Sequence, residues 1–304
     1  MATVQSPILV TTPTGNIGRR VTQRLLDAGE PTRLFVRDRN RLSIIAATHA
    51  EVVEGDLQRT DDLRTALDGV RAVFFLAPPN LSAESFGAWY THLGNAFVDA
   101  LPAGEAPRIV FLSSAGAQRD DLGPISALGA VENMLYKKAR HVVALRPGYF
   151  MENFLVNLAT IASEQTMYNA LPPDLPNPMV ATRDIADVAV RWLRSGDWAG
   201  HDCVGVHGPS DCTMREAAAV FSDALDRPVH YQQVSPEAVA ETLVSMGASP
   251  GIAADYASMT GGLAHYGTAY KAEPRTKSTT TPTTLKTFAR DVLRPAFEAQ
   301  GLHA

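Results

Sequence analysis

The chain has 304 residues, a length that predicts either two domains or one large α/β domain with an appendage. Its 27 lysines and arginines against 32 aspartates and glutamates give a net charge of −5, and such a chain lacks the positive field of a dedicated nucleic-acid binder. The two cysteines, Cys203 and Cys212, are too few for a disulfide framework or a zinc site. We therefore expect two buried free thiols and no metal site.

No targeting or membrane-spanning segment is visible in the sequence. The N-terminus has neither the basic start nor the apolar stretch of a signal peptide. The most apolar run, at 72–77, stops at Pro78 and Pro79 and is too short to cross a bilayer. These features predict a cytoplasmic protein that binds neither a membrane nor, directly, a nucleic acid.

Short β-rich runs alternate with helical patterns through the first half of the chain. Strands are predicted at 8–10, 33–36, 51–53, 72–76, 109–112 and 142–145. Between them, the spacing of apolar residues predicts helices at 17–28, 60–69, 84–100 and 125–138. This alternation predicts an α/β fold with a doubly wound parallel sheet of the Rossmann type, which binds its ligand along the edge formed by the C-terminal ends of the strands.

The second half is less regular. A proline-rich loop is predicted at 169–178, a helix at 184–193 and a strand at 203–206. Capping patterns predict helices at 213–225 and 236–246, and a polar loop at 276–284 precedes a last helix at 285–297. We therefore expect a dinucleotide-binding domain at 1–150 and a smaller α-rich substrate or lid subdomain at 151–304, packed on the edge of the sheet.

A glycine motif joins the first strand directly to the first helix. Backbone amides at a helix N-terminus form a binding site for a pyrophosphate, so the motif predicts cofactor contacts. Gly15 would let the phosphates approach closely, and Gly18 would let the helix pack on the strand. The residues of the motif assigned to the cofactor are Thr12, Thr14, Gly15, Asn16, Ile17 and Gly18.

A series of further motifs follows in chain order: TPTGNIG at 12–18, FVRD at 35–38, GDL at 55–57, VFFLAPP at 73–79, FLSSAG at 111–116, LRPGYFMENF at 145–154, DIADVAV at 184–190 and the closing TFARDVLRPAF. In this order, and over nearly the whole length of the chain, these motifs resemble those of the NmrA-like group of atypical short-chain dehydrogenases/reductases, which includes quinone-oxidoreductase-like and triphenylmethane-reductase-like proteins. The chain departs from the family at Thr12 and Pro13, where the family usually has glycine and alanine. Proline narrows φ there, and Thr12 adds a side chain beside the pyrophosphate.

The residue after the second strand decides between the two nicotinamide cofactors. Arg37 stands at that point, and a guanidinium matches a phosphate, which favours NADP(H). Asp38 follows directly and would instead hold a free ribose hydroxyl, so NAD(H) is the alternative. The resemblance implies that Arg37 contacts the 2′-phosphate. It also implies that Asp56 and Leu57 flank the adenine and that Leu76, Ala77 and Pro78 border the ribose and nicotinamide.

The usual proton-transfer machinery of ketone-reducing relatives is absent from the sequence. None of the eight tyrosines has a lysine four residues later. Some relatives place a lysine or histidine four residues before a glutamate that matches Glu132, but the residue there is Leu128. Ser114, at the end of the fifth strand, and Tyr149 are the weak catalytic candidates that remain, each with a plain structural role as the alternative.

Two functions stay open at this point. The first is an NADPH-dependent oxidoreductase that transfers hydride to a conjugated small molecule (a quinone, an enone or a cationic aromatic) in a pocket formed by Phe150, Met151 and Asn153. The second is a non-catalytic NmrA-type sensor of the NAD(P) redox state that acts through a regulatory protein partner. A homodimer is a further expectation.

Overall fold

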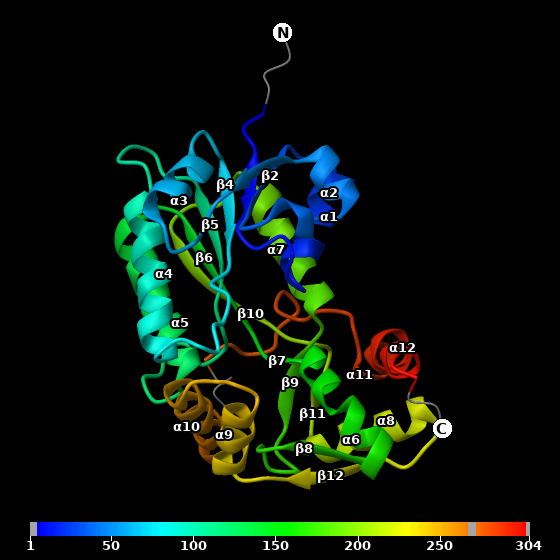
Figure 1. Cartoon of the computed structure of the whole chain (residues 1–304). Coiled ribbons are helices and arrows are strands. Elements are labelled where there is room, and N and C mark those ends of the chain that lie inside the picture. Colours follow the sequence, from blue (N-terminus) through cyan, green and yellow to red (C-terminus); the bar gives the residue numbers. More distant parts are fainter. Residues whose placement is uncertain (1–4, 267–271, 302–304) are drawn as a thin grey trace.

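A seven-stranded parallel sheet forms the centre of the upper half of the molecule (Figure 1). The computed structural model describes residues 5–266 and 272–301. In spatial order the strands of the sheet are β10 (His201–Val206), β6 (Val142–Pro147), β5 (Arg108–Leu112), β4 (Ala72–Phe75), β1 (Ile8–Val10), β2 (Thr32–Val36) and β3 (Glu51–Glu54). Every neighbouring pair is parallel. The predicted doubly wound α/β fold is confirmed.

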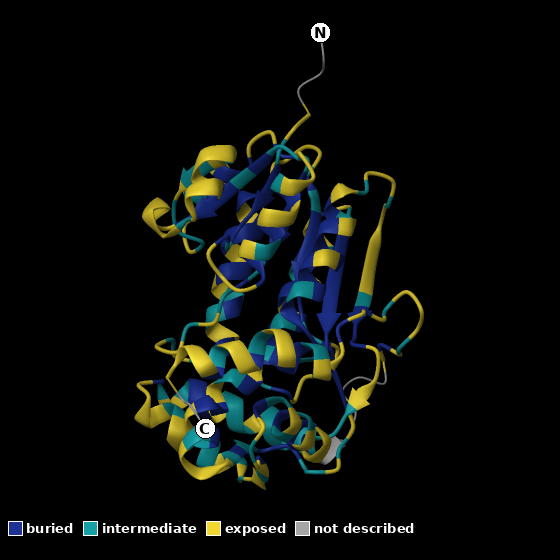
Figure 2. Ribbon diagram, turned by 90° about the vertical axis from the view of Figure 1, so that its right-hand side faces the viewer, coloured by how far each residue is buried: buried dark blue, intermediate teal, exposed yellow. Residues whose placement is uncertain are grey.

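Helices cover both faces of the sheet, as its strands require. Successive strand residues point to opposite faces, so Phe75 enters one core with α3 (Thr60–Leu67), α4 (Phe86–Ala100) and α5 (Pro124–Lys138). Phe74 enters the other core with α1 (Gly18–Asp27), α2 (Ile44–His49) and α7 (Thr182–Arg194). Both phenylalanines are fully buried, and Figure 2 shows the buried strands enclosed between the helical layers.

The lower half has its own core, which we call the C-terminal core. It contains a three-stranded sheet in the order β11–β9–β7 and a parallel β12–β8 pair. Its strands are β7 (Tyr149–Phe150), β8 (Thr166–Asn169), β9 (Asn177–Val180), β11 (Asp211–Cys212) and β12 (His230–Gln233). Around them pack η2 (Met151–Asn157), α6 (Leu158–Glu164), α8 (Met214–Leu225), α11 (Leu285–Phe288), the π-helical turn η3 (Ala289–Leu293) and α12 (Arg294–Ala299).

Helices α9 (Pro236–Ser245) and α10 (Pro250–Tyr266) form a hairpin whose second helix is docked on the Rossmann part. The carboxylate of Asp255 accepts a hydrogen bond of 2.7 Å from the backbone amide of Phe86 at the start of α4. Gly251 lies so close to the backbone of Glu84 that a Cβ would be 1.9 Å from its carbonyl oxygen. The hairpin is therefore a fixed wall of the molecule on the side of α4 and α5.

A buried ion cluster ties the C-terminal segment to the sheet. Arg146 on β6 bonds both carboxylate oxygens of Glu132 on α5, at 3.0 and 2.6 Å, and Oε1 of Glu273 at 2.6 Å. All three residues are less than a tenth exposed. Burial lowers the pKa of Arg146, but its hydrogen bonds with Glu132 and Glu273 outweigh burial and raise the pKa above its usual value. Glu132 therefore has a structural partner within the fold.

Three details differ from the sequence predictions. The predicted loop at 169–178 overlaps the end of β8 and the start of β9, and α10 was not predicted. Cys203 is exposed and Cys212 half-buried, so the prediction of two buried thiols is wrong: Cys203 lies on β10, the edge strand of the main sheet. The division at residue 150 stays a prediction, although α7 and β10 of its second part build the layers of the first.

Within the described ranges 5–266 and 272–301, no helix is long and apolar enough to cross a membrane.

Candidate functional site: a crevice at the switch point of the sheet

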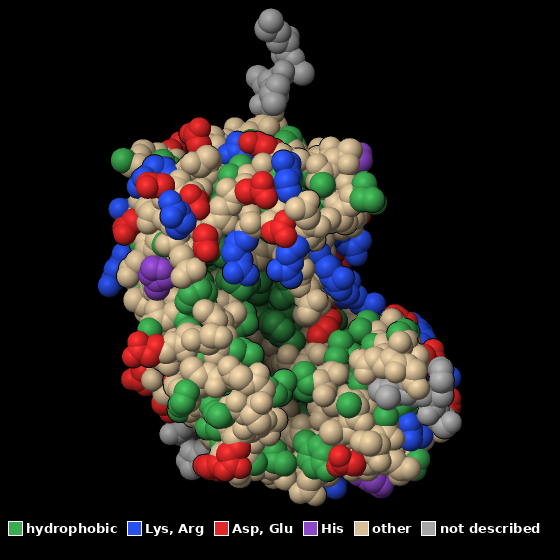
Figure 3. Space-filling model, viewed as in Figure 1, with side chains coloured by type: hydrophobic (Ala, Val, Ile, Leu, Met, Phe, Trp, Pro, Cys, Tyr) green, Lys and Arg blue, Asp and Glu red, His purple; other side chains and the backbone are tan. Residues whose placement is uncertain are grey.

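A crevice lies at the C-terminal ends of the neighbouring strands β1 and β4, because the segments that follow these two strands turn to opposite faces of the sheet. Thr11, the residue after β1, fixes this point: its hydroxyl donates to the carbonyl of Phe74 and accepts from the amide of Leu76, both at 3.2 Å. Figure 3 shows a hollow between the upper and lower halves, with hydrophobic side chains on its floor and lysine or arginine side chains along its upper rim.

The glycine loop has one glycine that the fold requires and one that it does not. A Cβ on Gly18 would lie 1.9 Å from the carbonyl oxygen of Thr12, so the start of α1 packs against the loop only as glycine. A Cβ on Gly15 would meet nothing nearer than that same oxygen at 3.6 Å, an ordinary contact. Gly15 is exposed and has no left-handed φ. Packing explains Gly18, whereas Gly15 leaves open space at the mouth of the crevice.

The loop presents unpaired polar groups to this space. The backbone amides of Thr14, Asn16 and Ile17 donate to no other residue of the described ranges, and the first turn of α1 contains no acidic residue. The hydroxyl of Thr12 is buried and has no hydrogen-bond partner. Free amides at the positive end of a helix form a site that binds an anion.

The substitutions at Thr12 and Pro13 leave the loop backbone unstrained. Among the described residues, Gln165 and Asp226 are the non-glycine residues with positive φ, so Thr12 has an ordinary backbone conformation. Its carbonyl accepts a hydrogen bond of 3.2 Å from the amide of Gly15, which closes the loop. The motif therefore keeps its helix N-terminus without the first glycine of the family pattern.

Arg37 and Asp38, the two residues after β2, have different roles. The carboxylate of Asp38 accepts a hydrogen bond of 2.9 Å from the amide of Asn40 and caps the short helix η1 (Arg39–Arg41). Arg37 is exposed and makes no hydrogen bond or ion pair with any described residue. Asp38 is thus engaged in its own turn, while the Arg37 guanidinium is available to a ligand.

The remaining residues assigned to the cofactor follow β3 and β4 at the same edge of the sheet. The Asp56 carboxylate accepts from the amide of Gln58 at 3.0 Å, and Leu57 is half-buried beside the core of α3 to α5. Leu76 is half-buried on the core of α1 and α7, Ala77 is buried, and the carbonyl of Pro78 accepts from the Trp89 indole at 2.7 Å. Their contacts with a cofactor stay a prediction.

The two weak catalytic candidates lie in different surroundings. The Ser114 hydroxyl donates to the carbonyl of Ala115 at 3.2 Å, and its neighbour Ser113 is buried with an unpartnered hydroxyl. Tyr149 packs against the C-terminal core, where its hydroxyl accepts a hydrogen bond of 3.1 Å from the Asn169 amide. Ser114 lies at the ligand edge, whereas the Tyr149 ring belongs to the other side of β7.

The three predicted pocket residues also separate. Phe150 is half-buried and packs on the core of α1 and α7, on the same side as Leu76. Met151 is buried in the C-terminal core and lines a cavity there, and Asn153 is exposed. The structure therefore brings Phe150 toward the crevice and places Met151 at a different cavity.

Sequence reasoning missed a cluster of charges beside the glycine loop. Arg20, in the first turn of α1, has a buried Nε with no partner. Burial lowers its pKa, as do Arg19 and Arg183, while Glu152 acts in the opposite direction. The Glu152 carboxylate accepts from the amide and hydroxyl of Thr182 at the start of α7. The pair of arginines directly after Gly18 was the signal in the sequence.

Comparison with known proteins decides the family. The sequence profile of the NmrA-like family matches residues 4–288. The chain belongs to the NmrA-like family. It is 32% identical over 244 residues to a (4-alkanoyl-5-oxo-2,5-dihydrofuran-3-yl)methyl phosphate reductase of Streptomyces griseus, covering 78% of this chain and 80% of the relative. It is 29% identical over 243 residues to an NAD(P)H azoreductase of Xenophilus azovorans, with 79% and 81% covered.

A solved structure shares the fold of this NmrA-like chain. The NADPH-dependent quinone oxidoreductase of Escherichia coli in complex with NADPH superposes with a TM-score of 0.77 at 22% identity, covering 94% of this chain and 99% of the other. The described residues contain no group of three or more His, Cys, Asp or Glu side chains arranged to hold a metal ion.

Proposed function

We propose that this NmrA-like protein is an NADPH-dependent oxidoreductase that transfers hydride to a conjugated small molecule. The observation that carries the proposal is the unpaired Arg37 guanidinium at the end of β2, beside an Asp38 carboxylate that is engaged in its own turn. The relatives named as an NAD(P)H azoreductase and as a reductase of an unsaturated lactone phosphate support the same class of reaction.

The residues present suit a phosphorylated dinucleotide. The diphosphate would lie at the N-terminus of α1, in the open space at Gly15. It would be held there by the free amides of Asn16 and Ile17 and by the unpartnered Thr12 hydroxyl. Arg37 would hold the 2′-phosphate through charge-assisted hydrogen bonds. Asp56 and Leu57 would flank the adenine, and Leu76, Ala77 and Pro78 would border the nicotinamide side.

When bound, NADPH supplies the hydride, and the chain's own residues orient the partners and exclude water. Thr11 holds β1 against β4, so the loops on the two sides of the crevice keep a fixed separation. Leu76 and Phe150 are half-buried on the same core and give the crevice apolar walls. Such walls suit a flat conjugated molecule and keep solvent away from the site of transfer.

The proposed substrate class follows from the proton donors of the site. The chain has no Tyr-x-x-x-Lys pair, the Ser114 hydroxyl donates to a backbone carbonyl, and the Tyr149 ring packs on the C-terminal core. A quinone, an enone or a cationic aromatic accepts hydride directly and takes any proton it needs from solvent on leaving the crevice. We therefore place the substrate in this group, where positioning rather than acid catalysis sets the rate.

The test is NADPH consumption by the purified protein with one member of each group: a benzoquinone, a cyclic enone and a cationic triarylmethane dye. We expect turnover of at least one of them, with NADPH faster than NADH. Thr11→Val, which loses the bonds that hold β1 to β4, should lower the rate, while Thr48→Val on the exposed face of α2 should not. Tight NADPH binding without turnover of any substrate would overturn the proposed reaction.

That outcome would favour a second candidate, a redox sensor that acts through a protein partner. One feature of the surface favours it: Ile44 and Ile45 on α2 are 85% and 54% exposed, three residues after the arginine-rich turn η1. Exposed adjacent isoleucines beside a cofactor site are suited to a partner that reads the bound state. A homodimer through the same surface is the other arrangement that we propose for this patch.

A further inference from the structure

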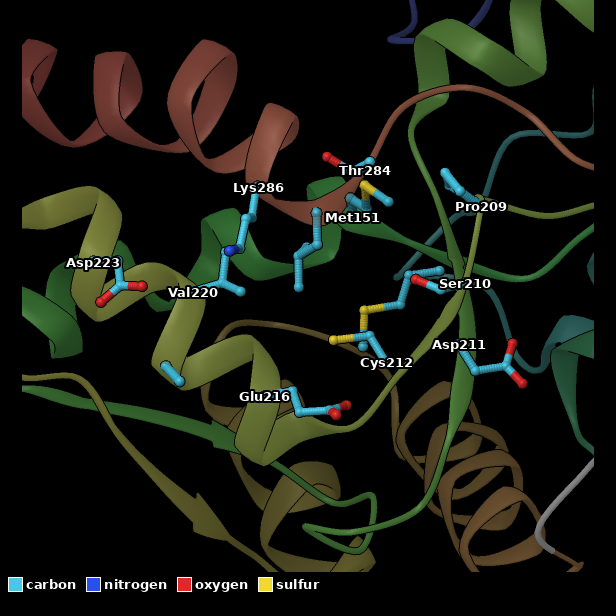
Figure 4. Close-up of a pocket in the computed structure, with 13 residues that line it drawn as sticks. Met151, Pro209, Ser210, Asp211, Cys212, Glu216, Val220, Asp223, Thr284 and Lys286 are labelled. Carbon is cyan, nitrogen blue, oxygen red and sulfur yellow. The ribbon is translucent and has the colours of Figure 1, made fainter.

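A cavity of about 490 Å³ lies in the C-terminal half, between α8, the start of α11 and strands β9 and β11 (Figure 4). It is separate from the crevice. Met179 on β9 lines it and belongs to the C-terminal core, whereas the next residue, Val180, points to the opposite face and enters the core of the main sheet. A cavity of this size is in the range that small organic ligands occupy.

Three sulfur-containing side chains line the inner part of the cavity. Met151 and Met179 are 2% and 1% exposed, and Cys212 is half-buried. Burial, and then the nearby Glu216 carboxylate, raise the pKa of the Cys212 thiol to about 11, so the thiol is neutral at pH 7. Polarisable sulfur atoms make favourable contacts with aromatic rings. The cavity therefore offers an apolar surface suited to an aromatic group.

One face of α8 forms a wall with an acidic residue at each end. Glu216, Ala219, Val220 and Asp223 follow the helical spacing and all line the cavity. Hydrogen bonds from the backbone and the hydroxyl of Thr213 lower the pKa of Glu216, which keeps it ionised. Asp223 has no ion pair with any described residue.

Carboxylates outnumber ammonium groups around this apolar surface. Asp211 is the third acidic residue of the lining and is paired with Arg275, and Lys286 is the lining residue with a positive charge. Figure 4 shows Lys286 and Asp223 at one end of the cavity and Glu216 toward the other. With Asp211 paired, the carboxylates of Glu216 and Asp223 against the ammonium group of Lys286 leave the lining with a net negative charge beside the sulfur-lined surface.

We propose that this cavity is a second ligand site, which binds a lipophilic organic cation. Aromatic groups of the ligand contact Met151, Met179 and Cys212, and its positive charge is attracted by Glu216 and Asp223. An anion of the same shape meets the same apolar surface but is repelled by the acidic wall. The inference does not depend on the proposed reaction, since no residue of this lining is assigned to the cofactor.

The test uses two redox-inert ions of matched shape and opposite charge, tetraphenylphosphonium and tetraphenylborate. Calorimetric titration of the full chain without cofactor should give at least tenfold tighter binding of the cation. Asp223→Asn should weaken binding of the cation severalfold, and Lys286→Ala should strengthen it. The matched control is Asp226→Asn at the residue that directly follows α8, outside the cavity and paired with Arg294, which should bind as wild type does.

Three results would overturn the proposal: equal binding of the two ions, no binding of the cation at millimolar concentration, or an unchanged dissociation constant in a folded Asp223→Asn protein. Saturating NADPH should leave cation binding unchanged, because the crevice lies on the other side of β9. Competition between NADPH and the cation would contradict the location of the site. It would leave the proposed reductase function standing, so the two proposals fail separately.

Discussion

Alanine at Gly15 and alanine at Gly18 should have opposite consequences, although the residues are three apart in one loop. The Cβ of Gly18→Ala would lie 1.9 Å from the Thr12 carbonyl oxygen and 2.7 Å from its carbon, so the loop or α1 must move by more than 1 Å. The Cβ of Gly15→Ala would lie 3.6 Å from the same oxygen, which needs no movement. One substitution disturbs the fold, and the other changes only the open space in front of it.

The expected magnitudes follow from these distances. Forced overpacking costs about 1–3 kcal/mol, so Gly18→Ala should unfold at a temperature lower by several degrees. Gly15 has no left-handed φ, and alanine at such a glycine is neutral or stabilises by about 0.4–1 kcal/mol through the unfolded chain. In the same protein the new methyl group stands in the space where we propose that the diphosphate approaches. We expect NADPH affinity to fall at least tenfold, which corresponds to about 1.4 kcal/mol.

Thermal unfolding followed by circular dichroism, together with NADPH titration by intrinsic fluorescence, separates these effects. Gly15→Ala should keep the wild-type unfolding temperature and lose affinity. If Gly15→Ala binds NADPH as tightly as wild type does, the loop does not hold the diphosphate. If Gly18→Ala is as stable as wild type, the packing of α1 on the loop is not as close as described.

Two further predictions concern buried ionisable side chains that contact Glu273 of the C-terminal segment. Arg146→Met should leave two buried carboxylates without their partner and lower the free energy of unfolding in urea by about 3–5 kcal/mol. A loss below about 1 kcal/mol would show that the cluster is not buried as described. Burial lowers the pKa of His207, so the unfolded chain takes up a proton at a higher pH than the folded protein does. The free energy of unfolding should therefore fall as the pH drops below about 6.5, the pKa of histidine in the unfolded chain. His207→Asn should reduce this pH dependence, and unfolding temperatures of wild type and variant that change in parallel with pH would contradict the prediction.

Much of the Rossmann part could be predicted because its signals are local. Each buried strand is a short apolar run, and the glycine loop stands between a strand and a helix in the sequence itself. The sequence could not show which polar side chains are already hydrogen-bonded within the fold and which are unpaired. Arg37 and Asp38 are adjacent and both polar, and only the folded turn shows that Asp38 caps η1 while Arg37 stays unpaired.

The helix α10 was missed because tertiary contacts, not propensity, stabilise it. Its glycines at 251, 261 and 262 disfavour a helix in isolation. In the fold, Gly251 allows the close approach to Glu84, and Asp255 caps α4, so the helix is held by the Rossmann part. The predicted substrate pocket failed for a similar reason. Phe150 and Met151 are adjacent in the sequence, but Phe150 ends β7 and Met151 follows it, so their side chains point to opposite sides and enter different cores.

The measurement that tests the central claim most directly is the affinity for NADPH against NADH in wild type, Arg37→Ala and Arg41→Ala. Arg41 is the matched control, since it is exposed on the same turn without an ion pair to a described residue. Wild type and Arg41→Ala should bind NADPH more tightly than NADH. Arg37→Ala should lose about 1–3 kcal/mol for NADPH, roughly 5- to 150-fold, and nothing for NADH. Equal affinities for the two cofactors in wild type and in Arg37→Ala would contradict the assignment of Arg37 and, with it, the NADPH-dependent function proposed for this chain.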